Sequence, residues 1–185
     1  MCGRYYIEIA EPELRAIVEE AQGLSGTPLN TGEIFPTNIV PVITADGKPL
    51  AMKWGFARFD GKGHIINARS ETAAGKTMFR RLLHEGRCLI PASNYFEWET
   101  MPDGKKQKYA ISTDKPLMYM AGLYHYEKGS KLPSFVVLTK EATEDLRHIH
   151  NRMPVIISAE EQINWLDGNS GLFIEQNAEM KHRKA

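Results

Sequence analysis

The residue with the most distinctive chemistry in this chain is Cys2, which directly follows the initiator methionine. Methionine in front of a small residue is normally trimmed, and its removal leaves an α-amine and a thiol on adjacent carbons. A free α-amine has a pKa of about 7.7 to 8.0 and a free thiol about 8.5, so both are partly available as nucleophiles near neutral pH. The amine can form a Schiff base with an aldehyde, and the thiol can then close a thiazolidine ring. The alternative is that cysteine at position 2 has no chemical role.

A second candidate is the polar run from Asn67 to Thr72, which follows a short apolar stretch. The Asn67 amide both donates and accepts hydrogen bonds, and the planar guanidinium of Arg69 suits phosphate. A polar turn that leads into a helix would explain the same residues.

A third candidate is Glu97, which lies between Phe96 and Trp98 in a predicted strand. Strand alternation places the two aromatic rings on one face and the carboxylate on the other. A carboxyl group in a partly apolar setting can serve as acid and base, and Trp98 or Tyr95 could stack on a nucleic-acid base. The alternative is a surface glutamate beside core aromatics.

The fourth candidate is the segment from His148 to Pro154. Histidine is the side chain suited to proton transfer near neutral pH, so His150 could move a proton or hold a sugar hydroxyl. Arg152 could pair with a phosphate or with Glu97. The two histidines suggest a metal, but no carboxylate or third histidine stands nearby in the sequence, so neither a metal nor another cofactor is predicted.

Composition limits the class of protein. The 185 residues are 42% hydrophobic and 25% charged, which is typical of one soluble globular domain. Lysine plus arginine and aspartate plus glutamate both number 23, which argues against coating nucleic acid through bulk charge but allows a local basic groove. The sequence shows no apolar run of about 20 residues and no signal-peptide pattern. We therefore expect a cytoplasmic monomer, without membrane contact, whose Cys2 and Cys88 stay reduced.

The order of predicted elements indicates an α+β fold with a mostly antiparallel, curved or barrel-like sheet core and several short helices. A helix is expected from Pro12, and two shorter ones near 76–84 and 141–148. Ala45 to Lys48 reads as the turn of a hairpin. Residues 1–175 are expected to form a single domain, followed by a polar, mobile tail over 176–185.

Taken together and in this order, the motifs resemble the SOS response-associated peptidase family, whose members are also described as abasic-site processing proteins. The matches run from residue 1 to about 157. The ordered set is specific, although no single motif is. The quoted matches are Met1-Cys2-Gly3-Arg4-Tyr5, Trp54-Gly55-Phe56, Asn67-Ala68-Arg69-Ser70-Glu71-Thr72, Arg87-Cys88-Leu89-Ile90-Pro91-Ala92, Tyr95-Phe96-Glu97-Trp98 and His150-Asn151-Arg152-Met153-Pro154.

The resemblance implies a β-barrel-like domain with a positively charged groove for single-stranded DNA, and bacterial nucleoid association while bound. It implies that Cys2, once Met1 is removed, forms a thiazolidine crosslink with the ring-opened sugar of an abasic site. Asn67 would contact the crosslinked site, Glu97 would act as acid and base, and His150 would bind the sugar oxygen. The implied DNA contacts or supporting residues are Arg4, Pro36, Trp54, Arg69, Trp98 and Arg152.

Two other functions remain open from the sequence. The family's older description implies a cysteine-type autopeptidase that cuts after Met1, with Glu97 and His150 assisting the Cys2 nucleophile. A non-covalent reader of damaged or modified DNA is the third possibility. The chain departs from the family at its end, because residues 174–185 lack the family's usual valine- and asparagine-containing strand.

Overall fold

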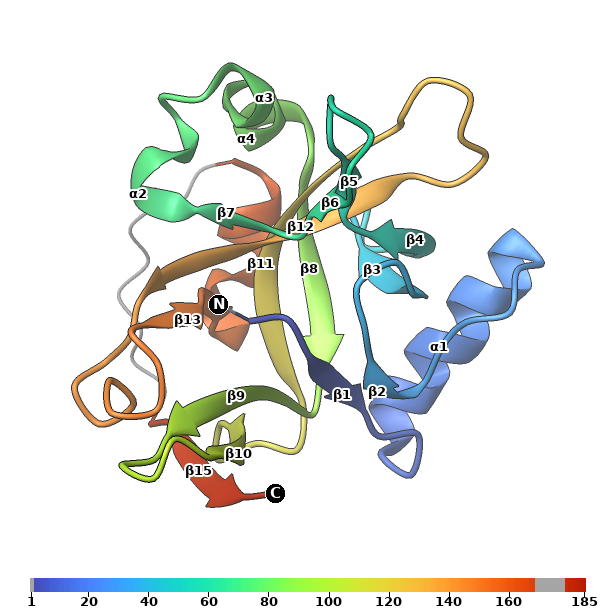
Figure 1. The fold of residues 1–185 in the computed structure, drawn as a ribbon. Coiled ribbons are helices and arrows are strands. Elements are labelled where there is room, and N and C mark those ends of the chain that lie inside the picture. The colour runs from blue at the N-terminus through green and yellow to red at the C-terminus, as the bar shows by residue number, and fades with distance from the viewer. Residues whose placement is uncertain (1, 169–178) are drawn as a thin grey trace.

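A closed β-barrel forms the centre of the computed structural model, which describes residues 2–168 and 179–185 (Figure 1). The ring order is β12, β4, β3, β8 and β11, and β11 pairs again with β12. Every neighbouring pair in the ring is antiparallel except β4 with β12, which is parallel. The predicted barrel-like α+β fold is therefore confirmed. The ring strands are β3 (Ile39–Ile43), β4 (Pro49–Trp54), β8 (Arg87–Ala92), β11 (Met118–His125) and β12 (Ser134–Glu141).

A second, antiparallel sheet lies at one end of the barrel, at the bottom of Figure 1. Its order is β15 (Lys181–Lys184), β10 (Lys106–Ser112), β9 (Asn94–Thr100), β1 (Tyr5–Ile7) and β2 (Gly32–Ile34). Short strands extend the barrel sheet or form a separate ribbon. They are β5 (Phe56–Ala57), β6 (His64–Ile65), β7 (Asn67–Arg69), β13 (Arg152–Pro154) and β14 (Ile156–Ile157).

The longest described helix, α1 (Pro12–Ser25), packs against the barrel through one apolar face. Pro12 occupies the first turn, where its missing N–H costs nothing, and Leu14, Val18 and Ala21 are buried at helical spacing. Gly26 ends the helix in the left-handed region. The other helices are short: α2 (Ser70–Ala73), α3 (Thr77–Arg80), α4 (Leu82–Glu85), the 3-10 helix Ala159–Glu161 and α5 (Gln162–Leu166).

The predicted hairpin is present in the structure, but two of the predicted short helices differ from what the structure shows. The predicted hairpin joins β3 to β4, and Gly47 in its turn has a φ of 74°. The single helix expected over 76–84 is two separate turns, α3 and α4. The helix expected over 141–148 is absent, because the chain there forms successive turns in which Leu146 N–H donates to Thr143 and Ile149 N–H to Leu146.

The end of the polar tail forms a strand that the sequence did not predict. Lys181–Lys184 form β15, which pairs with β10 in the register Ser112 with Lys181 through Tyr109 with Lys184. Backbone hydrogen bonds make this strand, since all four of its side chains are exposed. Residues 176–178 of the expected tail lie outside the described residues. In the described parts of the chain, no helix has the length and apolarity to cross a membrane.

Substitution of Gly122 tests how tightly the barrel wall is packed. A Cβ atom there would stand 2.4 Å from Ile90 Cδ1, 2.9 Å from the Val136 carbonyl oxygen and 3.0 Å from Cys88 Sγ. We expect Gly122→Ala to lower the free energy of unfolding by about 1–3 kcal/mol, because neighbours must shift to admit the methyl group. Urea unfolding measures this change.

Gly23→Ala is the matched control, since Gly23 lies in α1 with nothing within 4 Å of an added Cβ atom. There the same substitution should raise the free energy of unfolding by about 0.4–1 kcal/mol, by restricting the unfolded chain. Equal effects at the two positions would contradict a tightly packed barrel wall.

Candidate active site at the N-terminus

Cys2 is fully buried, just before β1 in the chain. Its side chain belongs to the main buried cluster, which also contains Tyr5, Tyr95, Ile149 and Met153. The Cys2 thiol donates a hydrogen bond to the Arg4 carbonyl oxygen over 3.8 Å. The predicted nucleophile is therefore held inside the protein, where water is excluded.

Burial changes the acidity of this thiol. Removal from water, followed by the negative charge of Glu97, raises the pKa of Cys2 to about 12, although the hydrogen bond to Arg4 opposes the shift. In the chain that carries Met1, the Cys2 thiol is therefore harder to ionise than a free thiol; the expectation of partial ionisation concerns the chain from which Met1 has been removed. Cys88 is also buried, and desolvation raises its pKa well above the ordinary value. Its side chain lies in the barrel core, as expected of a structural residue.

Asn67 joins the N-terminal segment to the barrel. It begins β7, which runs parallel to β12 with Asn67 opposite Val137. Its Nδ2 atom donates a 2.8 Å hydrogen bond to the Cys2 carbonyl oxygen. Its Oδ1 atom is buried and accepts no hydrogen bond from any residue that the structure describes. The side chain thus holds Cys2 with one end and presents an acceptor with the other.

Glu97 comes from the middle of β9, on the second sheet. Only 4% of its surface is exposed, and it pairs with Tyr109 of β10. Its charge raises the pKa of the Cys2 thiol and also contributes to the raised pKa of Tyr95, after burial and Cys2 itself. The carboxylate therefore faces the Cys2 region from the inner side of the sheet, whereas Phe96 and Trp98 lie on the outer side, as alternation predicted.

His150 lies in the turns before β13, and its orientation is fixed by its neighbour. The backbone N–H of Arg152 donates to His150 Nδ1 over 2.9 Å. Because that nitrogen accepts a hydrogen bond, the proton of the neutral ring is carried by Nε2. Ile149 and Met153, on either side of His150 in the chain, are buried in the same cluster as Cys2.

Arg152 pairs with Glu71, not with Glu97 as one reading of the sequence allowed. Its guanidinium donates two hydrogen bonds to the Glu71 carboxylate, at 2.7 and 2.9 Å, and two more to Thr139. This pairing lowers the pKa of Glu71. Arg152 therefore bridges α2 and β12 beside His150, and its charge is already matched by a carboxylate.

Arg4 lies at the outer side of the second sheet. It donates to Glu33 Oε1 over 3.0 Å, and Lys108 donates to the same oxygen over 2.8 Å. Hydrogen bonding from Lys108 first, and then from Arg4, lowers the pKa of Glu33. The Arg4 guanidinium also lies 4.0 Å from the centre of the Phe35 ring and 5.5 Å from that of Trp98. One carboxylate thus holds two cations against aromatic rings.

Pro36 lies at a rigid turn next to this group. Thr37 has a φ of 75°, which is uncommon for a residue with a side chain, and its N–H donates to the Trp54 carbonyl oxygen. The N–H of Phe35 donates to the Asn38 side chain, which closes the turn. The turn presents the exposed Phe35 ring beside Arg4.

Trp54 was wrongly predicted to contact DNA. It is fully buried, its ring is stacked on Phe135 at 6.3 Å between centroids, and its indole N–H donates to the Ile66 carbonyl oxygen. Trp54 is a barrel core residue, because its apolar surface is buried and its indole N–H is paired inside the protein. Arg69 is exposed at the end of β7, and Trp98 is half-buried at the outer face of β9.

Sequence reasoning missed three residues of this region: Glu33, Glu71 and Lys108. Glu71 stood inside a quoted motif, but its partner is 81 positions away. Lys108 stands opposite Trp98 in the β9–β10 register, a relation that only strand pairing reveals. Within the described residues, no group of three or more potential ligands could hold a metal ion.

The thiol chemistry can be checked directly. In the folded chain that retains Met1 and carries Cys88→Ala, we expect iodoacetamide to alkylate Cys2 slowly, with a rate that still rises above pH 9. A pKa of about 12 in place of 9 lowers the thiolate fraction at pH 8 by about 10³-fold. The urea-unfolded chain is the control, and its rate should be half-maximal near pH 9 and level off above about pH 10. A plateau at that pH in the folded protein would contradict the buried thiol.

Comparisons with known proteins place this geometry in a family. The family model described as SOS response associated peptidase (SRAP) matches residues 1–182. The abasic site processing protein YobE of Bacillus subtilis is 34% identical over 185 residues, covering 90% of this chain and 82% of YobE. The abasic site processing protein YedK of Escherichia coli is 29% identical over 176 residues, covering 90% and 79%.

Two further matches differ in extent. The abasic site processing protein YMR114C of Saccharomyces cerevisiae is 31% identical over 144 residues, which are 72% of this chain but 39% of the yeast protein. A crystal structure of a Bacteroides thetaiotaomicron protein superposes with a TM-score of 0.81 at 22% identity, covering 99% of this chain and 91% of that one. That likeness supports the fold, and the family match extends over nearly the whole sequence. The chain belongs to the SOS response associated peptidase (SRAP) family.

Proposed function

We propose that this protein captures abasic sites in single-stranded DNA as a covalent thiazolidine adduct of Cys2, formed after Met1 is removed. The observation that carries the proposal is the convergence of Cys2, Asn67 and Glu97, which come from three separate strands or strand ends, in one buried place. The names of the relatives, abasic site processing proteins, support the same class of substrate.

The α-amine acts first in this scheme. Once Met1 is gone, the free amine has an ordinary pKa of about 7.7 to 8.0, so a fraction of it is unprotonated at neutral pH. It attacks the aldehyde carbon of the ring-opened sugar, and loss of one water leaves an imine. The buried Oδ1 of Asn67 is the acceptor that could orient the amine, since Nδ2 already holds the Cys2 carbonyl.

Ring closure follows from the position of the thiol. Sulfur forms a bond to the imine carbon, and the imine nitrogen takes up a proton, which completes the five-membered ring. The thiol proton leaves to a base, and Glu97, whose charge acts on this thiol, is the candidate. The amine and the thiol stand on adjacent carbons, so the imine carbon lies beside the sulfur when the ring closes. His150, with its proton on Nε2, can donate to a sugar oxygen.

Burial weighs against the cysteine peptidase alternative. A peptidase cysteine needs a thiolate near neutral pH, and in the chain that retains Met1 the Cys2 pKa is raised to about 12. Self-cleavage after Met1 would have to start from that chain. The imine route needs no thiolate at the outset, so the site favours DNA capture.

Intact mass of the chain lacking Met1 tests the proposal. Mixing with a single-stranded oligonucleotide that carries one abasic site should add the oligonucleotide mass minus one water, and the adduct should persist in denaturant. Cys2→Ser keeps the amine but cannot close a stable thiazolidine, so we expect only an imine that borohydride traps. Cys2→Ala should give no stable thiazolidine.

Two results would redirect the assignment. Intact DNA binding without any wild-type adduct would favour a non-covalent reader of DNA. Cys2-dependent cleavage of a supplied peptide, without adduct formation, would favour a hydrolase.

A second prediction concerns the Glu71 carboxylate, which positions the His150 segment through Arg152. Glu71→Gln should slow adduct formation by roughly tenfold to a hundredfold, because a misplaced catalytic group is costly even when present. The pH profile of the rate should change with it, since the His150 ring loses its fixed orientation. Single-turnover crosslinking between pH 5.5 and 8.5, as a rough range for histidine titration, provides the measurement.

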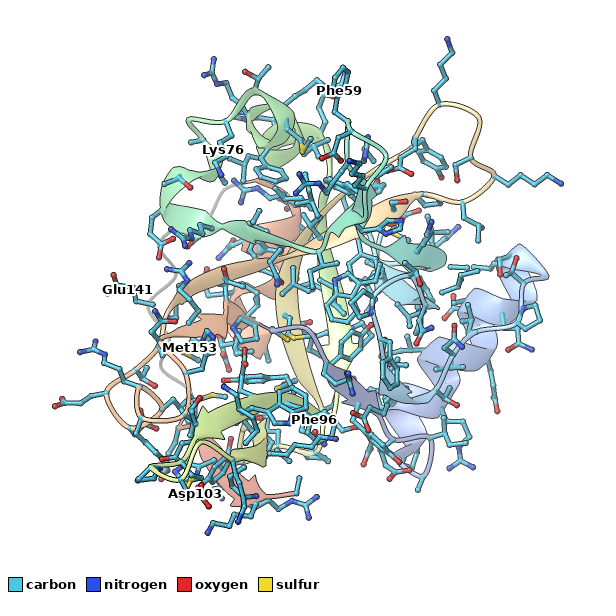
Figure 2. All side chains as sticks on the ribbon, viewed as in Figure 1. Phe59, Lys76, Phe96, Asp103, Glu141 and Met153 are labelled. Atoms are coloured by element: carbon cyan, nitrogen blue, oxygen red, sulfur yellow. The ribbon has the colours of Figure 1, made fainter. Side chains whose placement is uncertain are left out.

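Glu141→Gln is the matched control for this prediction. Glu141 is an exposed carboxylate on β12, directly opposite Arg152 in the strand register and labelled in Figure 2. Glu141→Gln changes the net charge of the protein by the same amount as Glu71→Gln, but it leaves the side-chain hydrogen bonds between Arg152 and Glu71 in place. Equal rate losses in the two variants would indicate a general charge effect and remove the positioning role of Glu71.

A further inference from the structure

We propose that the outer face of β10 and the C-terminal strand β15 forms a phosphate-binding track for the DNA strand that flanks the lesion. The inference rests on the proposed function, but concerns residues outside the Cys2 site. We call the four residues of this surface the basic face; they are Lys106, Lys108, Lys181 and Arg183.

Strand register places these four side chains on one side of the sheet. Ala110 of β10 lies opposite both Phe96 of β9 and Arg183 of β15. By alternation, Lys108 and Lys106 share this side with Ala110. Lys181, two residues before Arg183, also points to this side. The face therefore extends from the aromatic residues of β9 to the edge of the sheet.

The charge of this face is largely unmatched. Lys108 donates to Glu33, and Lys106 donates to the Thr100 hydroxyl. In the described part of the chain, neither Lys181 nor Arg183 forms an ion pair, and both are exposed. Lysine and arginine arranged along a strand face suit a polyanion whose charges repeat, and a nucleic-acid backbone has that form.

Aromatic rings join the basic face to the site. Lys108 Nζ lies 3.8 Å from the centre of the Phe96 ring and 5.8 Å from that of Trp98, on the outer side of the strand that carries Glu97. Cations interleaved with aromatic rings are typical of surfaces that follow a single strand, because every base can stack. Figure 2 shows Phe96 on β9, near the centre of the lower sheet, and Figure 1 shows β15 beside β10.

On the inner side of the sheet, a side chain of β15 contacts the segment that carries His150. The His182 ring lies 5.7 Å from that of Tyr109 and 5.4 Å from that of His148, between ring centroids. His148 is two positions from His150. On the outer side, a DNA strand that crosses from β9 over β10 to Arg183 of β15 covers roughly 10 Å, two strand spacings of the sheet.

The test compares DNA affinity at several salt concentrations for the full chain and for a Lys181→Gln/Arg183→Gln variant. With an abasic oligonucleotide of about 20 nucleotides, removal of two phosphate contacts should reduce the slope of log affinity against log salt by about 1.4. With an abasic oligonucleotide of about 3 nucleotides, in which one nucleotide on each side of the lesion cannot span two strand spacings, the slopes should agree. Binding is read before crosslinking, from the initial fluorescence anisotropy.

Matched variants separate charge from strand pairing. Lys181→Arg/Arg183→Lys keeps both charges and should keep the wild-type slope. Lys128→Gln/Lys131→Gln removes two exposed lysines from the loop between β11 and β12, at the opposite end of the molecule in Figure 1, and should leave the slope unchanged. An unchanged slope in the Lys181→Gln/Arg183→Gln variant would overturn the track. An equal loss with the short oligonucleotide would overturn it too, since it would indicate a structural effect on the site.

Failure of the track and failure of the proposed function give different results. If wild type forms the denaturant-stable adduct but the slope does not change, only the track is wrong. If no adduct forms although the slope falls as expected, the basic face binds DNA and the covalent function is wrong.

Discussion

The hydrogen bond from Asn67 to the Cys2 carbonyl is the contact on which the site depends, because it joins the N-terminus to the barrel. Asn67 is itself fixed by the parallel pairing of β7 with β12. The strand that follows Cys2, β1, pairs with β9, which carries Glu97. One buried place therefore receives residues from both sheets, and neither sheet alone could form it.

Burial of this junction decides what chemistry it supports. In the chain that carries Met1, removal from water and the nearby carboxylate raise the pKa of the Cys2 thiol, which disfavours indiscriminate reaction with electrophiles. On the proposed function, the α-amine provides the first bond and brings the electrophilic carbon to the sulfur. The protein thus gains selectivity from an environment that would impair an ordinary cysteine nucleophile.

Residues near one another in the sequence were predicted better than contacts between distant ones. Alternation along β9 placed Glu97 inside and Trp98 outside, since a strand requires only the local pattern. The Arg152 to Glu71 pairing depends on how β12, β7 and β13 meet, and no local pattern encodes it. Trp54 illustrates another limit, because an aromatic ring in a short motif suits a core as well as a base-stacking surface. The strand β15 was missed because its four exposed polar residues give no apolar period.

The fold places phosphate binding and the chemistry at Cys2 on different parts of the molecule, because the first needs exposure to solvent and the second benefits from burial. Phosphate binding needs exposed cations, and such cations include Lys181 and Arg183 on the outer sheet face and Arg69 at the end of β7. Loss of water from the amine–aldehyde adduct is favoured where bulk water is excluded, and Cys2 has no exposed surface. A nucleotide that has lost its base is smaller and no longer stacked, so turning its sugar inward costs less than extruding an intact nucleotide. On the proposed function, discrimination for the lesion therefore arises from access to a buried amine and thiol, and the surrounding charges need only hold the strand in place.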